Sequence, residues 1–183
     1  MVAGVKRSTS APPTAKVPPV SDSLVVRTLL AAARQRPDLD EGRCRLVLDW
    51  LRTAAAVRTA LQESLARHRL TELKFSILVV LFTLEPESST AADLAVHAGV
   101  TRAAITGALD GLQEQSLVTR QRDTADRRSL NVHLTDAGHQ VIEAALQRYL
   151  RTAGNIARFV KSTEQAAAST VCARLSFGAG GIA

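Results

Sequence analysis

The sequence predicts a mainly α-helical fold with one small β-hairpin. Apolar residues make up 46% of the 183 residues and aromatic residues only 3%. Ala, Leu, Val and Arg dominate, and this mixture favours helices over an all-β fold. Long stretches carry apolar residues at spacings of three and four, as helices with one buried face do. Two short segments instead have strand character, and a charged loop separates them.

The charge and the cysteines narrow the class of protein. A net charge of +6 raises the expectation of a polyanionic partner. Cys44 and Cys172 lie far apart, which argues against a disulfide framework and against a zinc site. No apolar run approaches about 20 residues, so we expect no membrane span. Lys6 and Arg7 precede no apolar stretch, so we expect no secretory signal and a cytoplasmic protein.

Residues 1–20 are predicted to be a disordered basic tail. They hold four prolines among Ser, Thr, Lys and Ala, too little apolar surface to offset the entropy of ordering. The tail is either a solvated leader or a non-specific phosphate-binding arm.

Two helices are predicted next. Ser21-Asp22-Ser23 offers an N-cap for a short helix over Leu24–Arg36, which Pro37 ends. After a turn over residues 38–42, a long helix is predicted over Arg43–His68. Its single apolar stripe consists of Val47, Trp50, Leu51, Ala54, Val57, Leu61 and Leu65.

A central helix and a helix-turn-helix follow. Thr71 is the predicted N-cap of a helix that reaches Leu84 and is apolar on almost every face, as a helix at the centre of a domain is. Two short helices, Ala91–His97 and Arg102–Gln115, are then joined by a tight turn around Gly99. The expected inward anchors are Leu94, Val100, Ile105, Leu109 and Leu112, with Ala95 at the close crossing.

A hairpin and two more helices complete the prediction. Strands over Leu117–Gln121 and Leu130–Leu134 flank the charged loop, which is the pattern of a wing. Thr135-Asp136 caps a long helix, with Gly154-Asn155 as a site of bending or interruption. Ser162-Thr163-Glu164-Gln165 has the capping-box pattern for a last helix to about Leu175, and residues 177–183 form a Gly-rich flexible tail.

Several short motifs resemble the MarR family of bacterial winged-helix transcription regulators. They follow one another in the family's order and spacing over about seventy residues. The motifs are Leu70-Thr71, Leu94-Ala95, Gly99-Val100-Thr101, Asp126-Arg127-Arg128 and Leu134-Thr135-Asp136-Ala137-Gly138.

The resemblance implies a homodimeric repressor that binds double-stranded DNA at a near-palindromic operator and needs no cofactor. It implies that residues 70–135 form the DNA-binding lobe, and that residues 21–69 and 136–176 supply the helices that join two copies. It also implies that the second helix of the motif enters the major groove while the wing arginine enters the minor groove.

The candidate DNA-contacting residues follow by position. Arg102, Ala103, Thr106, Gly107 and Asp110 line the outer face of the recognition helix. Arg102 reaches a base edge, and Thr101 or Thr106 meets a phosphate or a thymine methyl group. The remaining DNA candidates are Arg120, Arg122, Asp126, Arg127 and Arg128, of which Asp126 and Arg128 are the family's wing pair.

Two departures from the family pattern make the wing the more important part of the predicted DNA contact. Gly107 and Gly111 are predicted to leave the recognition helix without long side chains, so shape and phosphate contacts should carry a larger share of binding. Ser116 replaces the usual glycine at the turn into the wing.

Two hypotheses about how DNA binding is regulated remain open. The family's effector pocket implies a small aromatic acid, bordered here by Trp50, Arg58 and His68, and a subgroup with an extra N-terminal helix responds to urate-like purines. Alternatively, Cys44 between two arginines near a helix start is a redox switch, since cations and helix N-termini both lower a thiol pKa.

The enzyme and metal-binding classes are not favoured. The four histidines show no metal-ligand spacing, and the sequence has neither a phosphate loop nor a nucleophile elbow. A winged-helix protein-interaction module that binds no DNA remains the rival class, because of the two glycines on the recognition helix.

Overall fold

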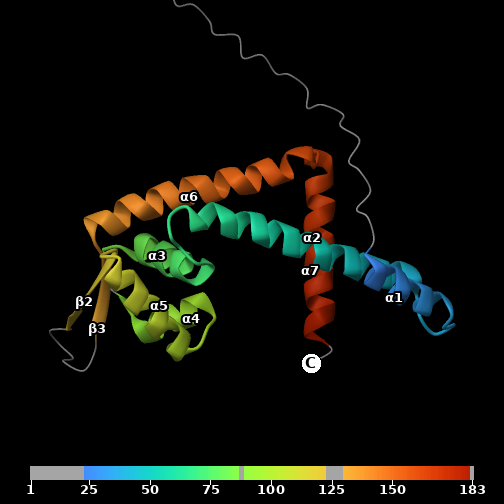
Figure 1. Cartoon of the computed structure of the whole chain (residues 1–183), viewed down its shortest axis with the longest axis horizontal. Helices are drawn as coiled ribbons and strands as arrows, with labels where there is room; N and C mark the ends of the chain where they lie inside the picture. Colours follow the sequence, from blue (N-terminus) through green and yellow to red (C-terminus); the bar gives the residue numbers. More distant parts are fainter. Residues whose placement is uncertain (1–22, 87–88, 123–129, 182–183) are drawn as a thin grey trace, which may run out of the picture. The chain divides into compact units, whose positions relative to one another are not determined.

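The computed structural model describes residues 23–86, 89–122 and 130–181. It confirms the predicted class, because long helices surround one small antiparallel sheet (Figure 1). The helices are α1 (Leu24–Arg34), α2 (Glu41–Ala66), α3 (Glu72–Leu84), α4 (Ala91–Ala98), α5 (Arg102–Glu114), α6 (Asp136–Ile156) and α7 (Ser162–Gly180). The strands are β1 (Ser89–Thr90), β2 (Val118–Arg122) and β3 (Leu130–Leu134).

The chain divides into two compact units. One unit spans residues 54–157 and holds the second half of α2, the helices α3 to α6 and the sheet. The other unit combines residues 23–53 with residues 158–181 of the described part of the chain.

The helix α3 forms the centre of the first unit. It packs against α4, α5, α6 and β3, and Figure 1 shows it between α6 and the α4–α5 pair. Ile77 and Leu78 are fully buried, so the prediction of a central helix from its apolar faces is confirmed. Thr71 caps it, since the Thr71 hydroxyl accepts a hydrogen bond from the Lys74 amide at 3.2 Å.

The sheet has the strand order β1-β3-β2, and all its pairs are antiparallel. Val118 faces Leu134 and Arg122 faces Leu130, so β2 and β3 form the predicted hairpin. The strand β1 was not predicted, because two residues are too few to show an alternating pattern.

The base of the hairpin is fixed by three residues. Ser116 adopts a left-handed φ of +57°, the conformation that favours glycine at such a turn. The Thr135 hydroxyl donates a hydrogen bond to the Ser116 carbonyl at 2.7 Å and accepts one from the Gly138 amide at 2.9 Å. A Cβ atom at position 138 would overlap the carbonyl oxygen of Leu117. Position 138 therefore has room for glycine alone.

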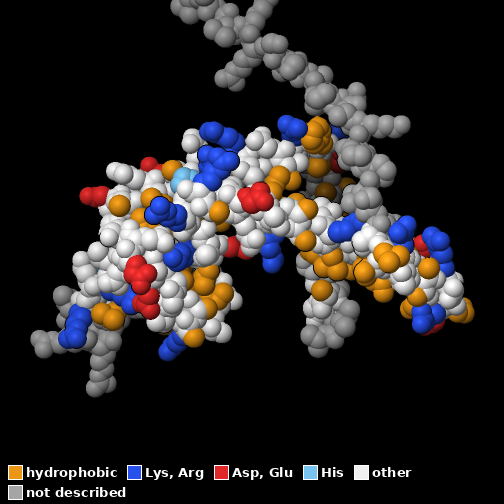
Figure 2. Space-filling view, viewed as in Figure 1, with side chains coloured by type: hydrophobic (Ala, Val, Ile, Leu, Met, Phe, Trp, Pro, Cys, Tyr) orange, Lys and Arg blue, Asp and Glu red, His pale blue; other side chains and the backbone are white. Residues whose placement is uncertain are grey.

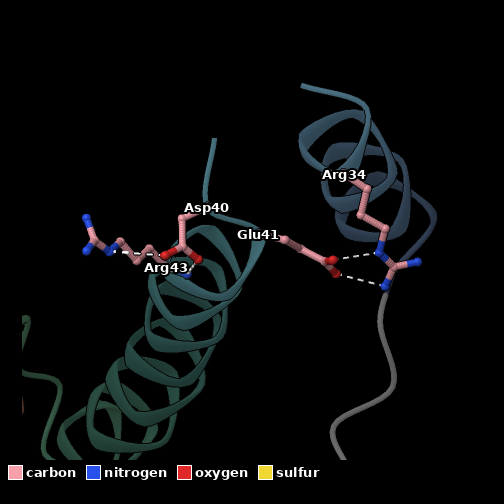
Figure 3. Close-up of polar contacts among 4 residues, drawn as sticks. All are labelled: Arg34, Asp40, Glu41 and Arg43. Atoms are coloured by element: carbon pink, nitrogen blue, oxygen red, sulfur yellow. Dashed lines mark hydrogen bonds and ion pairs between the residues drawn. The ribbon is translucent and has the colours of Figure 1, made fainter. Parts of the chain in front are cut away.

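In the second unit, polar contacts join the end of α1 to the start of α2 (Figure 3). The Arg34 guanidinium donates Nε to Glu41 at 2.6 Å and Nη2 at 2.8 Å, a two-pronged contact. This hydrogen bonding raises the pKa of Arg34 and lowers the pKa of Glu41. Asp40 accepts a hydrogen bond from the Arg43 amide at 3.0 Å and thereby caps α2.

Three helix ends near the N-terminus differ from their predicted positions. The helix α1 ends at Arg34 rather than Arg36, because the residue before a proline disfavours helical geometry. The Asp40 cap starts α2 at Glu41, two residues before the predicted Arg43. Arg69 adopts a left-handed φ of +56°, and α2 ends at Ala66 rather than His68.

The C-terminal helices also differ from their predictions. Gly154-Asn155 does not interrupt α6, which continues to Ile156 before a single 3-10 turn over Ala157–Phe159. The Glu164 carboxylate accepts a hydrogen bond from the Lys161 amide at 2.9 Å, so α7 begins one residue earlier than the Ser162 cap predicted. It continues to Gly180, past the predicted end at Leu175.

The close approach at position 138 has a testable consequence. We expect Gly138→Ala to lower the free energy of unfolding by roughly 2 kcal/mol or more, because the Leu117 backbone must move. Gly154→Ala in the same helix is the control, since a Cβ there meets open space and should be neutral or stabilising by about 0.5–1 kcal/mol. Urea denaturation measures both, and equal stability of the two variants would contradict the packing described.

Candidate nucleic-acid interface

The first helix of the motif is fixed by a reciprocal cap. The Thr90 hydroxyl accepts a hydrogen bond from the Asp93 amide at 3.3 Å, and the Asp93 carboxylate accepts one from the Thr90 amide at 3.0 Å. A bond from the Thr90 hydroxyl to the same carboxylate, at 2.7 Å, is the main cause that lowers the pKa of Asp93. The cap is therefore complete above the ordinary pKa of an aspartate and weakens in acid.

The turn of the motif reverses the chain at Gly99. Gly99 has a φ of +65°, and the Val100 amide donates a hydrogen bond to the Ala95 carbonyl at 3.1 Å. The predicted anchors Leu94, Ile105, Leu109 and Leu112 are fully buried, and Ala95 is buried at the helix crossing. Val100 was wrongly predicted to be an anchor: it is 37% exposed, because it lies on the outer side of this turn.

The recognition helix α5 starts at a cap and presents an exposed face. The Thr101 hydroxyl accepts a hydrogen bond from the Ala104 amide at 3.3 Å. The predicted outer residues are all exposed: Arg102, Ala103, Thr106, Gly107 and Asp110. Arg102 stands in the first turn and forms no ion pair within the described part of the chain.

The two glycines of α5 face different surroundings. At Gly107 a Cβ atom would meet nothing within 4 Å, so this position belongs to the open face. At Gly111 a Cβ atom would lie 2.6 Å from the Nζ atom of Lys74 in α3. The prediction that Gly111 shares the open face was wrong, because this glycine makes room for the lysine side chain.

An ion pair joins the recognition helix to the wing. Arg120 of β2 donates Nη2 to the Asp110 carboxylate of α5 at 2.6 Å. The Arg120 side chain is only 23% exposed, and its Nε atom is shut off from solvent. The sequence predicted that Arg120 contacts DNA, whereas in the structure its guanidinium is bound to Asp110. Spacing along the chain gave no signal for this pair, since the two residues belong to different elements.

The remaining wing candidates lie toward the tip. Arg122, the last residue of β2, is exposed. Asp126, Arg127 and Arg128 lie outside the described residues, so their roles stay predictions from the sequence.

The effector candidates do not share one cavity. Arg58 lines a cavity of about 220 Å³ beside α3 and α6, together with Tyr149. His68 lines a different cavity, of about 370 Å³, on α6. Trp50 belongs to the other unit, where it is partly exposed.

Cys44, the redox candidate, also lies in that other unit. It lines a mainly apolar cavity of about 560 Å³ together with Arg36 and Arg43. Among the residues described, both cysteines are free and no cluster of ligating side chains suits a metal ion. None of the described helices combines the length and apolar character needed to cross a bilayer.

The pair between Asp110 and Arg120 can be tested by a double-mutant cycle on stability. We expect Asp110→Asn and Arg120→Gln to be coupled by roughly 1 kcal/mol, at the upper end for exposed pairs, because Arg120 is half-buried. The same cycle on the more exposed Asp40–Arg43 pair should give about 0.5 kcal/mol or less. A coupling energy near zero for Asp110 and Arg120 would contradict the structural role of the pair.

Comparison with known proteins agrees with this geometry. Residues 70–130 match the model of the MarR family. The chain is 32% identical over 113 residues to the HTH-type transcriptional repressor YetL of Bacillus subtilis, a match that spans 62% of this chain and 65% of the repressor. It is 25% identical over 123 residues to the HTH-type transcriptional regulator PecS of Dickeya dadantii, which spans 67% of this chain and 74% of PecS. The match to YetL thus covers slightly less than two thirds of that repressor.

Solved structures share the fold. A MarR family transcription regulator superposes with a TM-score of 0.68 at 21% identity, covering 78% of this chain and 93% of the other. The repressor CouR bound to a 23-mer DNA duplex gives 0.64 at 23% identity, covering 76% and 99%. The family model, the sequence relatives and the shared fold agree, and residues 70–130 form a MarR-family domain.

Proposed function

We propose that this chain is a homodimeric transcriptional repressor that binds double-stranded DNA and is released by a small molecule. One observation carries the DNA-binding part: the exposed face of α5, which begins at Arg102, is tied to the wing by the Asp110–Arg120 pair. Two solved structures with this fold, CouR and MepR of S. aureus, are complexes with DNA.

The N-terminal end of α5 can bind the edge of a base. Arg102 carries a fork of donors that can bind a guanine in the major groove, and the helix N-terminus favours a phosphate. The Thr106 hydroxyl already donates to the Arg102 carbonyl at 3.0 Å, which leaves the Thr106 methyl group for apolar contact. Gly107 adds no side chain, so DNA can approach the helix backbone closely there.

The wing supplies positive charge without base reading. Arg122 is exposed at the end of β2, and the sequence continues to Arg127 and Arg128. Contacts from such residues to phosphates position a protein on DNA and give its affinity a steep salt dependence.

A second copy of the chain accounts for the exposed apolar surface. The stripe of α2 changes along its length, from Leu65 at 1% exposure to Leu51 at 54%. The exposed apolar residues outside the DNA-reading face include Leu46, Val47, Trp50, Leu51, Leu150, Ile156, Phe159 and Val171. Within one unit, the exposed Leu46, Val47, Trp50 and Leu51 lie together on α2, and such an apolar group is typical of an interface between subunits. A monomer in sedimentation velocity at micromolar concentration would contradict the dimer.

The cavity beside Arg58 is the proposed effector site. Apolar side chains, the Tyr149 ring, Gln62 and Glu72 line it, and Arg58 can pair with a carboxylate. The related structure of BpsR from Bordetella bronchiseptica concerns regulation of its DNA binding by 6-hydroxynicotinic acid. An aromatic acid is therefore the proposed class of ligand. If no aromatic acid or purine raised the melting temperature, this part of the proposal would fail.

Two arginine variants test the DNA interface. We expect Arg102→Ala to lose roughly 1–3 kcal/mol of preference at one or two base pairs. We expect Arg122→Ala to weaken binding to all duplexes similarly. It should also reduce the slope of log affinity against log salt concentration by about 1. Fluorescence anisotropy with the chain's own upstream region measures both effects, and a dimer should protect two half-sites about one helical turn apart.

Arg67→Ala is the control, since Arg67 is exposed in the turn after α2 and belongs to neither α5 nor the hairpin. If the wild-type chain bound no duplex, the rival hypothesis of a protein-interaction module would hold. Equal binding of every duplex would contradict a repressor with a defined operator. If the Arg67 and Arg122 variants reduced the salt dependence of DNA binding equally, the wing would not make a specific phosphate contact.

A further inference from the structure

A polar cavity on α6 lies apart from both the DNA-reading face and the cavity beside Arg58. Its volume is about 370 Å³, and it belongs entirely to the unit over residues 54–157. It is lined by His68, Ala144, Gln147, Arg148, Arg151, Thr152 and Asn155. Figure 2 shows Lys and Arg side chains gathered over α6 on the face in view, with histidine beside them.

His68 contributes a buried nitrogen with no partner. It lies in the turn between α2 and α3, where its amide donates a hydrogen bond to the Leu65 carbonyl at 2.9 Å. The Nε2 atom is shut off from solvent and has no hydrogen-bond partner among the described residues. A buried polar atom left without a partner costs free energy, so a ligand atom that reached it would restore that loss.

Two arginines stand one turn apart on α6 at the same cavity. Within the described ranges, neither Arg148 nor Arg151 pairs with a carboxylate, whereas Arg34 and Arg120 do. No aspartate or glutamate lines the cavity. Positive charge is therefore concentrated there without an internal counterion.

The other lining groups add hydrogen-bond capacity. Gln147, Thr152 and Asn155 present amides and a hydroxyl. Together with Ala144, Arg148 and Arg151 they recur at spacings of three and four along one face of α6. Guanidinium forks match the geometry of carboxylates and phosphates, and they bind such groups by charge-assisted hydrogen bonds.

We propose that this cavity binds a small oxyanion with two negative charges, either phosphate or a short dicarboxylate. Arg148 and Arg151 hold its oxygens, and a rotation of the His68 side chain brings the buried Nε2 atom to the anion from the turn. A bound anion would link the α2–α3 turn to α6. The site differs in chemistry from the cavity beside Arg58, which is mainly apolar, and the proposal does not depend on DNA binding.

Isothermal titration calorimetry on the full chain tests the site, with inorganic phosphate and succinate as probes at constant ionic strength. We expect saturable binding of one anion per chain by at least one probe. Binding of phosphate alone assigns a phosphate site, and binding of succinate alone assigns a dicarboxylate site. Sodium chloride in place of the probe should give no saturable heat.

Variants separate a built site from general attraction to a basic protein. Arg148→Gln, Arg151→Gln and His68→Phe should each weaken binding about tenfold, as expected for the loss of one hydrogen bond to a charged group. Arg67→Gln, with the same change of charge outside the cavity, should leave the affinity unchanged. Circular dichroism verifies the fold of each variant, and the two arginine variants alter only exposed side chains.

Absence of saturable binding by both probes would overturn the proposal. So would equal weakening by Arg67→Gln and Arg151→Gln, because the anion would then respond to net charge alone. Unchanged affinity in both the Arg148→Gln and Arg151→Gln variants would have the same consequence.

Discussion

The backbone of Gly138 passes so close to the Leu117 carbonyl that no side chain fits between them, and the placement of the wing beside α5 depends on this approach. It places the first turn of α6 against the start of β2. The Thr135 hydroxyl bonds to both sides of the junction, and Ser116 accepts a left-handed backbone so that α5 can turn into the wing. The Asp110–Arg120 pair then joins the middle of α5 to the middle of β2. Helix and wing are thereby fixed as one piece.

Rigid coupling matters because the two elements are proposed to read different features of DNA. A helix in the major groove identifies bases, while a basic hairpin follows phosphates and groove width. The binding free energies of the helix and the hairpin add only if both elements can contact DNA in one position of the protein. Arg120 therefore serves the interface indirectly, by holding β2, and it leaves Arg102 and Arg122 as the exposed cations of the described face. The open position at Gly107 fits a recognition helix that lies close to its target and reads few bases.

Sequence alone predicted the features that depend on local chemistry. Thr71, Thr101 and Thr135 each cap the helix expected of them, and the apolar faces of α3 identified the centre of the core. The features it missed depend on contacts between distant segments. The strand β1 exists only because β3 pairs with it, and Gly111 is explained only by Lys74 of another helix. The ion pair of Arg120 with Asp110 and the exposure of Val100 likewise depend on tertiary packing. The spacing of residues along the chain does not predict such contacts.

We propose that α5 and the β2–β3 hairpin together form the surface that binds DNA. Amide hydrogen exchange of the full chain, with and without a duplex from its own upstream region, tests this most directly. We expect slower exchange in the presence of DNA at residues 101–107 and along β2 and β3, since a bound duplex covers these amides. We expect little change in the exposed first half of α2. Protection confined to α2, or binding without protection of α5, would show that DNA binds elsewhere.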